Sequence, residues 1–208
     1  MADARRISPL ADRARIEAPD GAASLAELPH LGRLILRADG AAAARAVKKA
    51  LGAEPPTEPN TSSRSKEALM LWLGPDEWML VTEPGSEEAL FDQLKDALSE
   101  THCQLVDVSD QLTNIELSGA RAREILMKLT TLDLHPRQIG PGDVAGTTFG
   151  SVTATLFVTD DVKKHETQRF QLIVRRSVAD YMWCLLAEAG REFGLPEQQP
   201  RSGETMRP

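Results

Sequence analysis

Cysteine and aromatic residues are scarce in this chain of 208 residues, which has two cysteines and only 4% aromatic side chains. The cysteines, Cys103 and Cys184, lie far apart among apolar neighbours, which predicts two buried free thiols rather than a disulfide scaffold. No apolar run approaches the roughly 20 residues that a membrane-spanning helix needs. No apolar stretch follows Arg5 and Arg6 either, so we expect no secretory signal peptide and a cytoplasmic location.

An excess of positive charge is also missing. Lys and Arg number 24 against 31 Asp and Glu, which gives a formal net charge of −7. Nucleic-acid binding depends on basic side chains facing phosphates, so this balance argues against a nucleic-acid partner. The hydrophobic fraction of 41% is that of an ordinary globular protein, and the length is enough for one sizeable core or two smaller ones.

The familiar catalytic motifs are absent as well. The sequence has no glycine-rich dinucleotide fingerprint, no phosphate-binding loop and no Gly-x-Ser-x-Gly elbow, and none of its four histidines is spaced like a metal ligand. We therefore expect no catalytic, cofactor-binding or metal-binding residue in this chain. His135 follows closely after Asp133, and a catalytic Asp–His pair is one interpretation. A loop histidine before the turn residue Pro136 is the favoured alternative, because adjacency in sequence does not establish hydrogen-bond geometry.

Composition divides the chain into four parts. Residues 1–30 resemble an arm that is either disordered or laid across another surface, and the polar residues 196–208 resemble a disordered tail. Between them we predict a first α+β unit over residues 31–108 and a second over residues 109–195. The proline- and serine-rich residues 54–66 are predicted to form a surface loop.

The first α+β unit reads β-α-β-β-α-β, the order of a ferredoxin-like unit. The predicted strands cover residues 31–37, 68–73, 78–82 and 102–108, and the predicted helices cover residues 41–51 and 86–98. Gly52 ends the first helix, Ser86 is a candidate N-cap of the second, and Pro75 sets the turn between the two middle strands.

The second unit repeats the order β-α-β-β-α. Alternating residues predict strands near 113–117, 152–158 and 170–174, and helical patterns cover residues 120–129 and 177–193. Ser177 is a candidate N-cap of the last helix, and a longer loop is expected around residues 136–146. The fold class that we predict is α+β, with two ferredoxin-like units.

Four residues are candidate partner contacts. Trp72 and Trp78 flank a tight turn, and either core packing across a hairpin or a place in an interface would explain them. Arg175 and Arg176 precede the last helix on a chain that is acidic overall. Such a pair could clamp a carboxylate or phosphate, although arginines at such a position are more often solvated or form ion pairs with a partner.

Several segments resemble the glycine-cleavage T-protein family. They are residues 103–109, which end in Asp-Val-Ser, and residues 115–126, 130–134 and 140–148. The resemblance spans roughly residues 103–194 and implies the fold of that family's folate-binding core.

A closer resemblance is to the gamma subunits of heterotetrameric sarcosine oxidase. It rests on residues 72–80, which read Trp-Leu-Gly-Pro-Asp-Glu-Trp-Met-Leu, on residues 132–137 and on residues 174–181. The resemblance implies one T-protein-like body in a complex with alpha, beta and delta subunits. It also implies that the complex demethylates sarcosine oxidatively to glycine and passes the methyl group to tetrahydrofolate. The complex would carry FAD, FMN, NAD and, in the delta subunit, zinc, with none of these in this chain.

The departures from the T-protein pattern define the expected role. T-protein relatives have acidic residues in the strand after the glycine that is here Gly150, whereas residues 151–155 contain no carboxylate. Their later strand ends in an Asn near the folate, whereas Arg175 and Arg176 follow Val174 here. The chain is also too short for the extra C-terminal domain of a T-protein. We therefore expect a structural, non-catalytic subunit that keeps the fold without the site. The alternatives are a stand-alone folate-binding enzyme or maturation factor of the T-protein class, and an adaptor for an unrelated complex.

Overall fold

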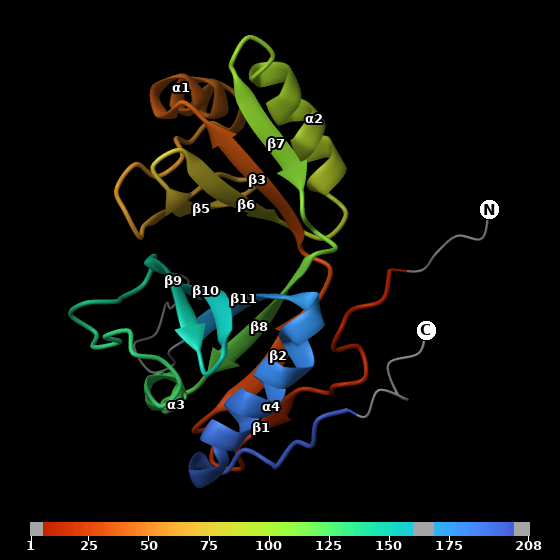
Figure 1. Ribbon diagram of the computed structural model, residues 1–208, viewed down its shortest axis with the longest axis vertical. Helices are drawn as coiled ribbons and strands as arrows, with labels where there is room; N and C mark the ends of the chain where they lie inside the picture. Colours follow the sequence, from red (N-terminus) through yellow and green to blue (C-terminus); the bar gives the residue numbers. More distant parts are fainter. Residues whose placement is uncertain (1–5, 160–168, 202–208) are drawn as a thin grey trace. The chain divides into compact units, whose positions relative to one another are not determined.

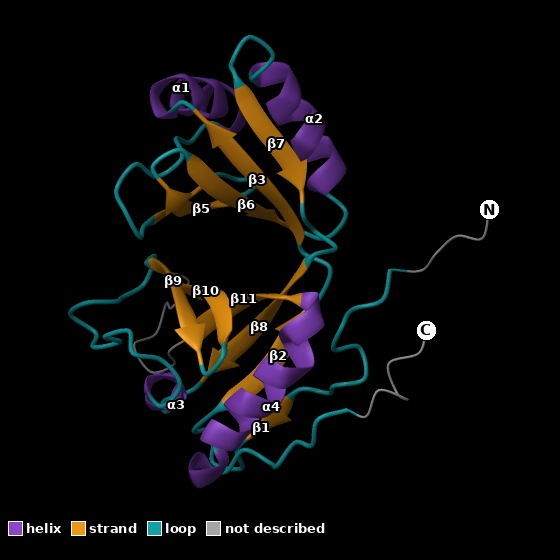
Figure 2. Ribbon diagram, viewed as in Figure 1, coloured by secondary structure: helices purple, strands orange, loops and turns teal. Residues whose placement is uncertain are grey.

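The chain divides into two compact units in the computed structural model, which describes residues 6–159 and 169–201. The central unit comprises Pro29–Leu112 and Gly142–Ala145. The terminal unit comprises Met1–Leu28, Thr113–Pro141 and Gly146–Pro208. Figure 1 follows the chain through both units, and Figure 2 distinguishes their strands from their helices.

The central unit is a five-stranded sheet with the strand order β4-β5-β6-β3-β7. Its elements are β3 (Gly32–Ala38), α1 (Gly40–Leu51), β4 (Ser62–Arg64), β5 (Leu69–Gly74), β6 (Glu77–Thr82), α2 (Glu87–Ala97) and β7 (Cys103–Asp107). Strand β3 pairs antiparallel with both β6 and β7, and β6 pairs antiparallel with β5. Numbered along the chain, β3, β5, β6 and β7 stand in the order 4-1-3-2, which confirms the predicted ferredoxin-like unit.

Local chemistry explains why α1 begins and ends where it does. The Asp39 carboxylate accepts hydrogen bonds from the backbone N–H groups of Ala41 and Ala42, and Gly52 ends the helix in the left-handed conformation. The buried side chains of Ala43 and Val47 lie one turn apart. Both belong to a core cluster in which α1 and α2 pack on one face of the sheet, as Figure 1 shows.

The terminal unit is a six-stranded sheet with the strand order β1-β2-β8-β11-β10-β9. Its strands are β1 (Ile16–Glu17), β2 (Ser24–Leu28), β8 (Leu112–Ser118), β9 (Val144–Phe149), β10 (Val152–Val158) and β11 (Arg169–Arg175). Its helices are α3 (Ala122–Met127) and α4 (Ala179–Ala189), with short 3-10 turns η1 (Arg176–Val178) and η2 (Arg191–Phe193) on either side of α4. Helices α3 and α4 contact one another.

The structure differs from the sequence prediction in the N-terminal region. Residues 24–28 are not part of an arm, because β2 pairs antiparallel with β8 from Ser24↔Ser118 to Leu28↔Asn114. A ferredoxin-like sheet has a fourth strand beside its first, and the predicted order β-α-β-β-α of the second unit does not supply it. In the structure, β2 occupies this place beside β8. The side chain of Leu25 is fully buried as a result. A five-residue strand with one large core residue is too short for its pattern to identify it.

Smaller corrections concern helix starts and short strands. Ser86 occupies the N-cap position of α2, as predicted, although its side chain makes no capping hydrogen bond. Ser177 does not cap α4, since it lies in the 3-10 turn that precedes this helix. Strand β4 lies within the predicted 54–66 loop, where Ser62 pairs with Leu71. Strand β9 begins inside the predicted 136–146 loop. Both cysteines are free, as predicted, but they are half-buried rather than buried.

Candidate partner-contact surface

The two candidate tryptophans face each other across the β5–β6 hairpin. Trp72 and Trp78 are register partners, so their side chains project from the same face of the sheet. Trp78 is only 1% exposed and its indole N–H donates to the carbonyl of Pro56 at 2.8 Å. Trp72 is half-buried near the turn. Trp78 therefore belongs to the core and has no surface to offer a partner, and of the two only Trp72 remains a candidate contact.

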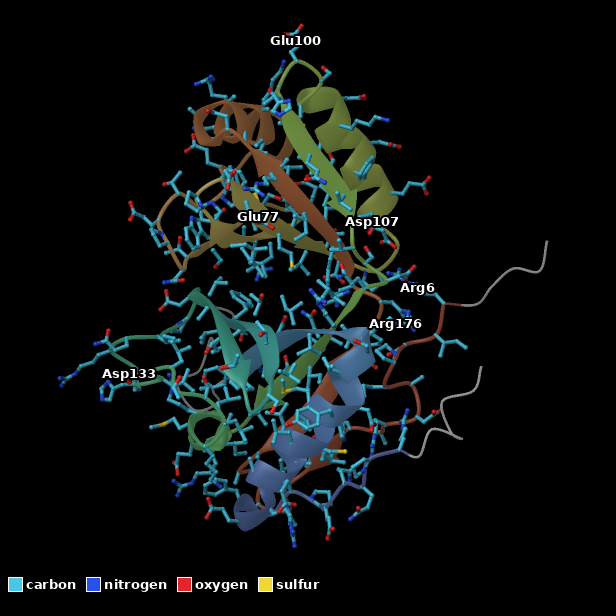
Figure 3. All side chains as sticks on the ribbon, in the orientation of Figure 1. Arg6, Glu77, Glu100, Asp107, Asp133 and Arg176 are labelled. Atoms are coloured by element: carbon cyan, nitrogen blue, oxygen red, sulfur yellow. The ribbon has the colours of Figure 1, made fainter. Side chains whose placement is uncertain are left out.

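The candidate arginines lie where β11 passes into η1, and both are exposed. The Arg175 side chain makes no hydrogen bond or ion pair with any residue in the described ranges 6–159 and 169–201. Arg176 is tied to the N-terminal segment, because its guanidinium donates to the carbonyl of Ile7 at 3.2 Å. Figure 3 labels Arg6 and Arg176 and shows both on this part of the unit. The N-terminal segment therefore lies beside Arg176 on this surface.

Buried contacts hold that N-terminal segment in place. The hydroxyl of Ser8 and that of Thr113 donate to the two carboxylate oxygens of Glu27, the second at 2.6 Å, and Leu10 is 1% exposed. Ile7 projects with 57% of its surface exposed. We call the exposed group formed by Arg6, Ile7, Arg175 and Arg176 the basic patch. Sequence reasoning missed Arg6 and Ile7, since nothing local shows that they meet residues near position 176.

A second junction joins the two ends of the described chain to α4. The Asp180 carboxylate accepts from the guanidinium of Arg13 at 2.6 Å and from the backbone N–H of Arg201 at 3.0 Å. Arg13 also donates to the sulfur of Cys184 at 3.4 Å. Burial raises the pKa of the Cys184 thiol, so at neutral pH it is protonated and a poor nucleophile. Through Asp180, the segments around Arg13 and Arg201 are both attached to α4.

A cavity of about 400 Å³ lies in the central unit at the start of α1. It is lined by Arg37, Asp39, Asp76, His102, Cys103 and their neighbours. Its charged groups already have internal partners, because Arg37 pairs with Asp76 at 3.0 Å and Asp39 caps α1. This hydrogen bond with Asp76 raises the pKa of Arg37. Arg37, Asp39 and Asp76 thus serve the local structure at the start of α1.

Asp133 and His135 do not form a catalytic Asp–His pair. The Asp133 carboxylate accepts from the backbone N–H of His135 at 2.9 Å rather than from its ring, and the His135 Nδ1 accepts from the backbone N–H of Arg137 at 3.2 Å. The catalytic interpretation of this pair is therefore wrong, and His135 is a loop residue. Among the residues that the structure describes, no group of three or more His, Cys, Asp or Glu side chains could hold a metal ion.

The strand that follows Gly150 carries no acidic side chain. Gly150 occupies the turn between β9 and β10 with φ of +57°, and the following strand β10 reads Val-Thr-Ala-Thr-Leu-Phe-Val. It presents no carboxylate, and β11 ends in Arg175.

Within the described residues, no helix is both long and apolar enough to cross a membrane.

Comparison with known proteins decides the family. The family described as "Sarcosine oxidase, gamma subunit family" matches residues 36–192, which is most of the chain. The chain belongs to the sarcosine oxidase gamma subunit family. The sarcosine oxidase subunit gamma of an Arthrobacter species is 30% identical over 85% of this chain and 84% of its own length. That of Corynebacterium sp. strain U-96 is 31% identical over 62% of this chain and 58% of its own length.

Solved structures agree with this family assignment. A chain of the heterotetrameric sarcosine oxidase of Corynebacterium sp. U-96 matches with a TM-score of 0.80 at 28% identity, over 93% of this chain and 99% of that chain. The glycine-cleavage aminomethyltransferase T of Bartonella henselae matches with a TM-score of 0.65 at 15% identity, over 88% of this chain and 48% of that one. This chain thus has the fold of part of aminomethyltransferase T, as the sequence motifs predicted.

Proposed function

We propose that this chain is the gamma subunit of a heterotetrameric sarcosine oxidase and that it is a structural, non-catalytic part of that complex. The observation that supports this most strongly is the match over nearly the whole length of a chain from such a complex. The chemistry of the described residues is consistent with a structural role, because they include no metal-type cluster and β10 carries no carboxylate. A strand of neutral residues cannot supply a general base or a counter-charge to a folate nitrogen.

In this proposal the other subunits carry out the reaction. Alpha, beta and delta subunits would bind FAD, FMN, NAD and zinc, demethylate sarcosine oxidatively to glycine and transfer the methyl group to tetrahydrofolate. The gamma subunit would contribute surface to the assembly, with the basic patch and Trp72 as contacts. An arginine-rich surface on a chain of net charge −7 is a favourable place for an acidic partner surface.

Copurification tests the proposal directly. A tagged form of this chain, co-expressed with the other subunits from the same organism, should copurify with flavin-bearing chains in stoichiometric amount. The chain purified alone should show no flavin absorbance and no sarcosine oxidation. Stoichiometric flavin on the isolated chain, or failure to join any flavin-bearing assembly, would contradict the proposal.

The second candidate is a stand-alone folate-binding protein, which the fold of aminomethyltransferase T suggests. Calorimetric titration of the isolated chain with tetrahydrofolate separates the two. We expect no heat of binding at micromolar concentrations, since residues 151–155 provide no carboxylate for the folate. Tight binding would favour the alternative.

A further inference from the structure

A half-buried arginine anchors the backbone of the loop between α3 and β9. Arg123 on α3 donates from one guanidinium nitrogen to the carbonyl of Leu134 and, at 3.1 Å, to that of Ile139. The same guanidinium lies over the ring of Phe170 with 5.0 Å to its centroid. Burial lowers the pKa of Arg123, but a guanidinium remains charged at any physiological pH. A single side chain therefore fixes two separate points of the loop backbone.

Two apolar anchors complete the attachment of residues 130–141. The side chains of Leu134 and Ile139 are 1% and 8% exposed. Between them the backbone forms a closed turn, in which the N–H groups of Gln138 and Ile139 both donate to the carbonyl of His135, at 2.8 and 3.1 Å. The ring of His135 adds the bond to the N–H of Arg137. The loop backbone is therefore ordered by internal contacts of the terminal unit.

The side chains at the tip of this loop contribute little to those contacts. All four residues from His135 to Gln138 are exposed, and Figure 3 shows the neighbouring Asp133 on this outlying loop. Within the described residues, the Arg137 guanidinium makes no hydrogen bond or ion pair. Exposed side chains at such positions add little to stability. An ordered backbone that presents them lowers the entropy lost on binding, and long loops without their own helix or strand are usually functional.

We infer that residues 133–138 form a preordered docking loop for another subunit of the sarcosine oxidase complex, with Arg137 binding a carboxylate on that subunit. The inference rests on the proposed function and adds a second contact region to the basic patch. An acidic partner surface is the occupant that fits Arg137, because its guanidinium makes no hydrogen bond or ion pair among the described residues. The nearby Asp133 carboxylate accepts from the backbone N–H of His135 instead. Arg123 does not touch the partner and is a positioning residue.

Binding measurements with matched variants test this inference. The isolated chain is titrated against the complex assembled from the other three subunits, at low and at high ionic strength. Arg137→Ala should weaken binding at low salt by about tenfold or more, with a smaller loss at high salt, because salt screens an exposed charge. Arg137→Lys keeps the charge and should recover part of the affinity, and neither variant should change the melting temperature of the free chain.

The positioning role of Arg123 has its own readout. In Arg123→Met, amide hydrogen exchange over residues 133–139 should increase while Arg137 is still present, and binding should weaken with it. Arg121→Met at the N-cap of the same helix is the control, since Arg121 pairs with Glu124 on the surface rather than with the loop. This control should leave both loop exchange and binding unchanged.

The outcomes separate the inference from the proposed function. Wild-type affinity of Arg137→Ala and Arg123→Met, in a chain that still joins the complex, would overturn the docking loop and leave the proposed function standing. Failure of the wild-type chain to join the complex would overturn both. Self-association of the isolated chain that Arg137→Ala abolishes would identify a second copy as the occupant, which would also overturn the inference.

Discussion

Trp72 and Trp78 are chemically identical and lie opposite one another, yet only one of them is a core residue. The indole of Trp78 belongs to the core cluster of the central unit, and its N–H donates to the Pro56 carbonyl at 2.8 Å. A buried indole without such an acceptor would be destabilising. The carbonyl comes from the loop that precedes β4, so this loop is part of what holds the tryptophan.

Replacing Trp78 tests this difference at the scale of a residue. Trp78→Ala should lower the free energy of unfolding by about 3–5 kcal/mol, because it leaves a large cavity and an unpaired Pro56 carbonyl. Chemical denaturation of the purified chain measures the loss. Trp72→Ala is the matched control and should cost clearly less, since that side chain is half-buried. Equal losses for the two variants would refute the distinction.

Strand β2 is an integral element of the terminal unit, although the sequence predicts its region to be an arm. Its close approach to the end of β8 requires a glycine there. Gly119 has φ of +117°, and a Cβ atom at this position would lie 2.3 Å from the carbonyl oxygen of Ala22. Real Cβ atoms do not approach a backbone oxygen so closely, so residue 119 admits no side chain while the β2–β8 pairing is intact.

Gly119→Ala is the corresponding prediction for this element. It should lower the free energy of unfolding by at least about 2 kcal/mol, because both the positive φ and the contact with Ala22 become unfavourable. Thermal or chemical unfolding provides the measurement, and hydrogen exchange should show β2 opening first. Gly146→Ala is the control, since a Cβ there meets nothing within 4 Å. A stable Gly119→Ala variant with protected β2 amides would show that this strand is not held as described.

At the scale of the whole molecule, assembly should depend on the basic patch. Replacing Arg175 and Arg176 together with alanine should weaken assembly with the other subunits, since two exposed cations are lost from a chain of net charge −7. The melting temperature of the free chain should change little, because both side chains are exposed. Analytical ultracentrifugation of the reconstituted complex at low ionic strength measures the effect.

Two further variants make this result interpretable. Arg175→Ala alone removes a side chain without internal partners among the described residues, so any effect of it on assembly is a partner effect. Arg176→Ala alone also removes the hydrogen bond to Ile7, and its effect includes loosening of the N-terminal segment. Wild-type assembly of the double variant would exclude the patch as a contact, and a large drop in free-chain stability would make the pair structural.

Much of the fold follows from local pattern. The helices α1 and α2, the β5–β6 hairpin and the order of elements in the central unit were predictable, because the period of apolar residues, capping groups and turn residues act within a few positions of one another. In the same way, the missing carboxylates after Gly150 could be read directly from the residues. The gamma-subunit family could also be inferred from the short motifs around Trp72, Leu132 and Val174.

Contacts between distant parts of the chain decided the rest. The sequence alone determined which residues are helical or extended, the net charge and the family motifs, since these depend on neighbours and composition. Only the tertiary structure placed β2 beside β8 and buried Trp78 more deeply than Trp72. It also brought Ile7 into contact with Arg176, and Arg123 into contact with the carbonyl of Leu134. The free energy of such pairings comes from burial and hydrogen bonds formed when remote segments meet, and no local propensity encodes it.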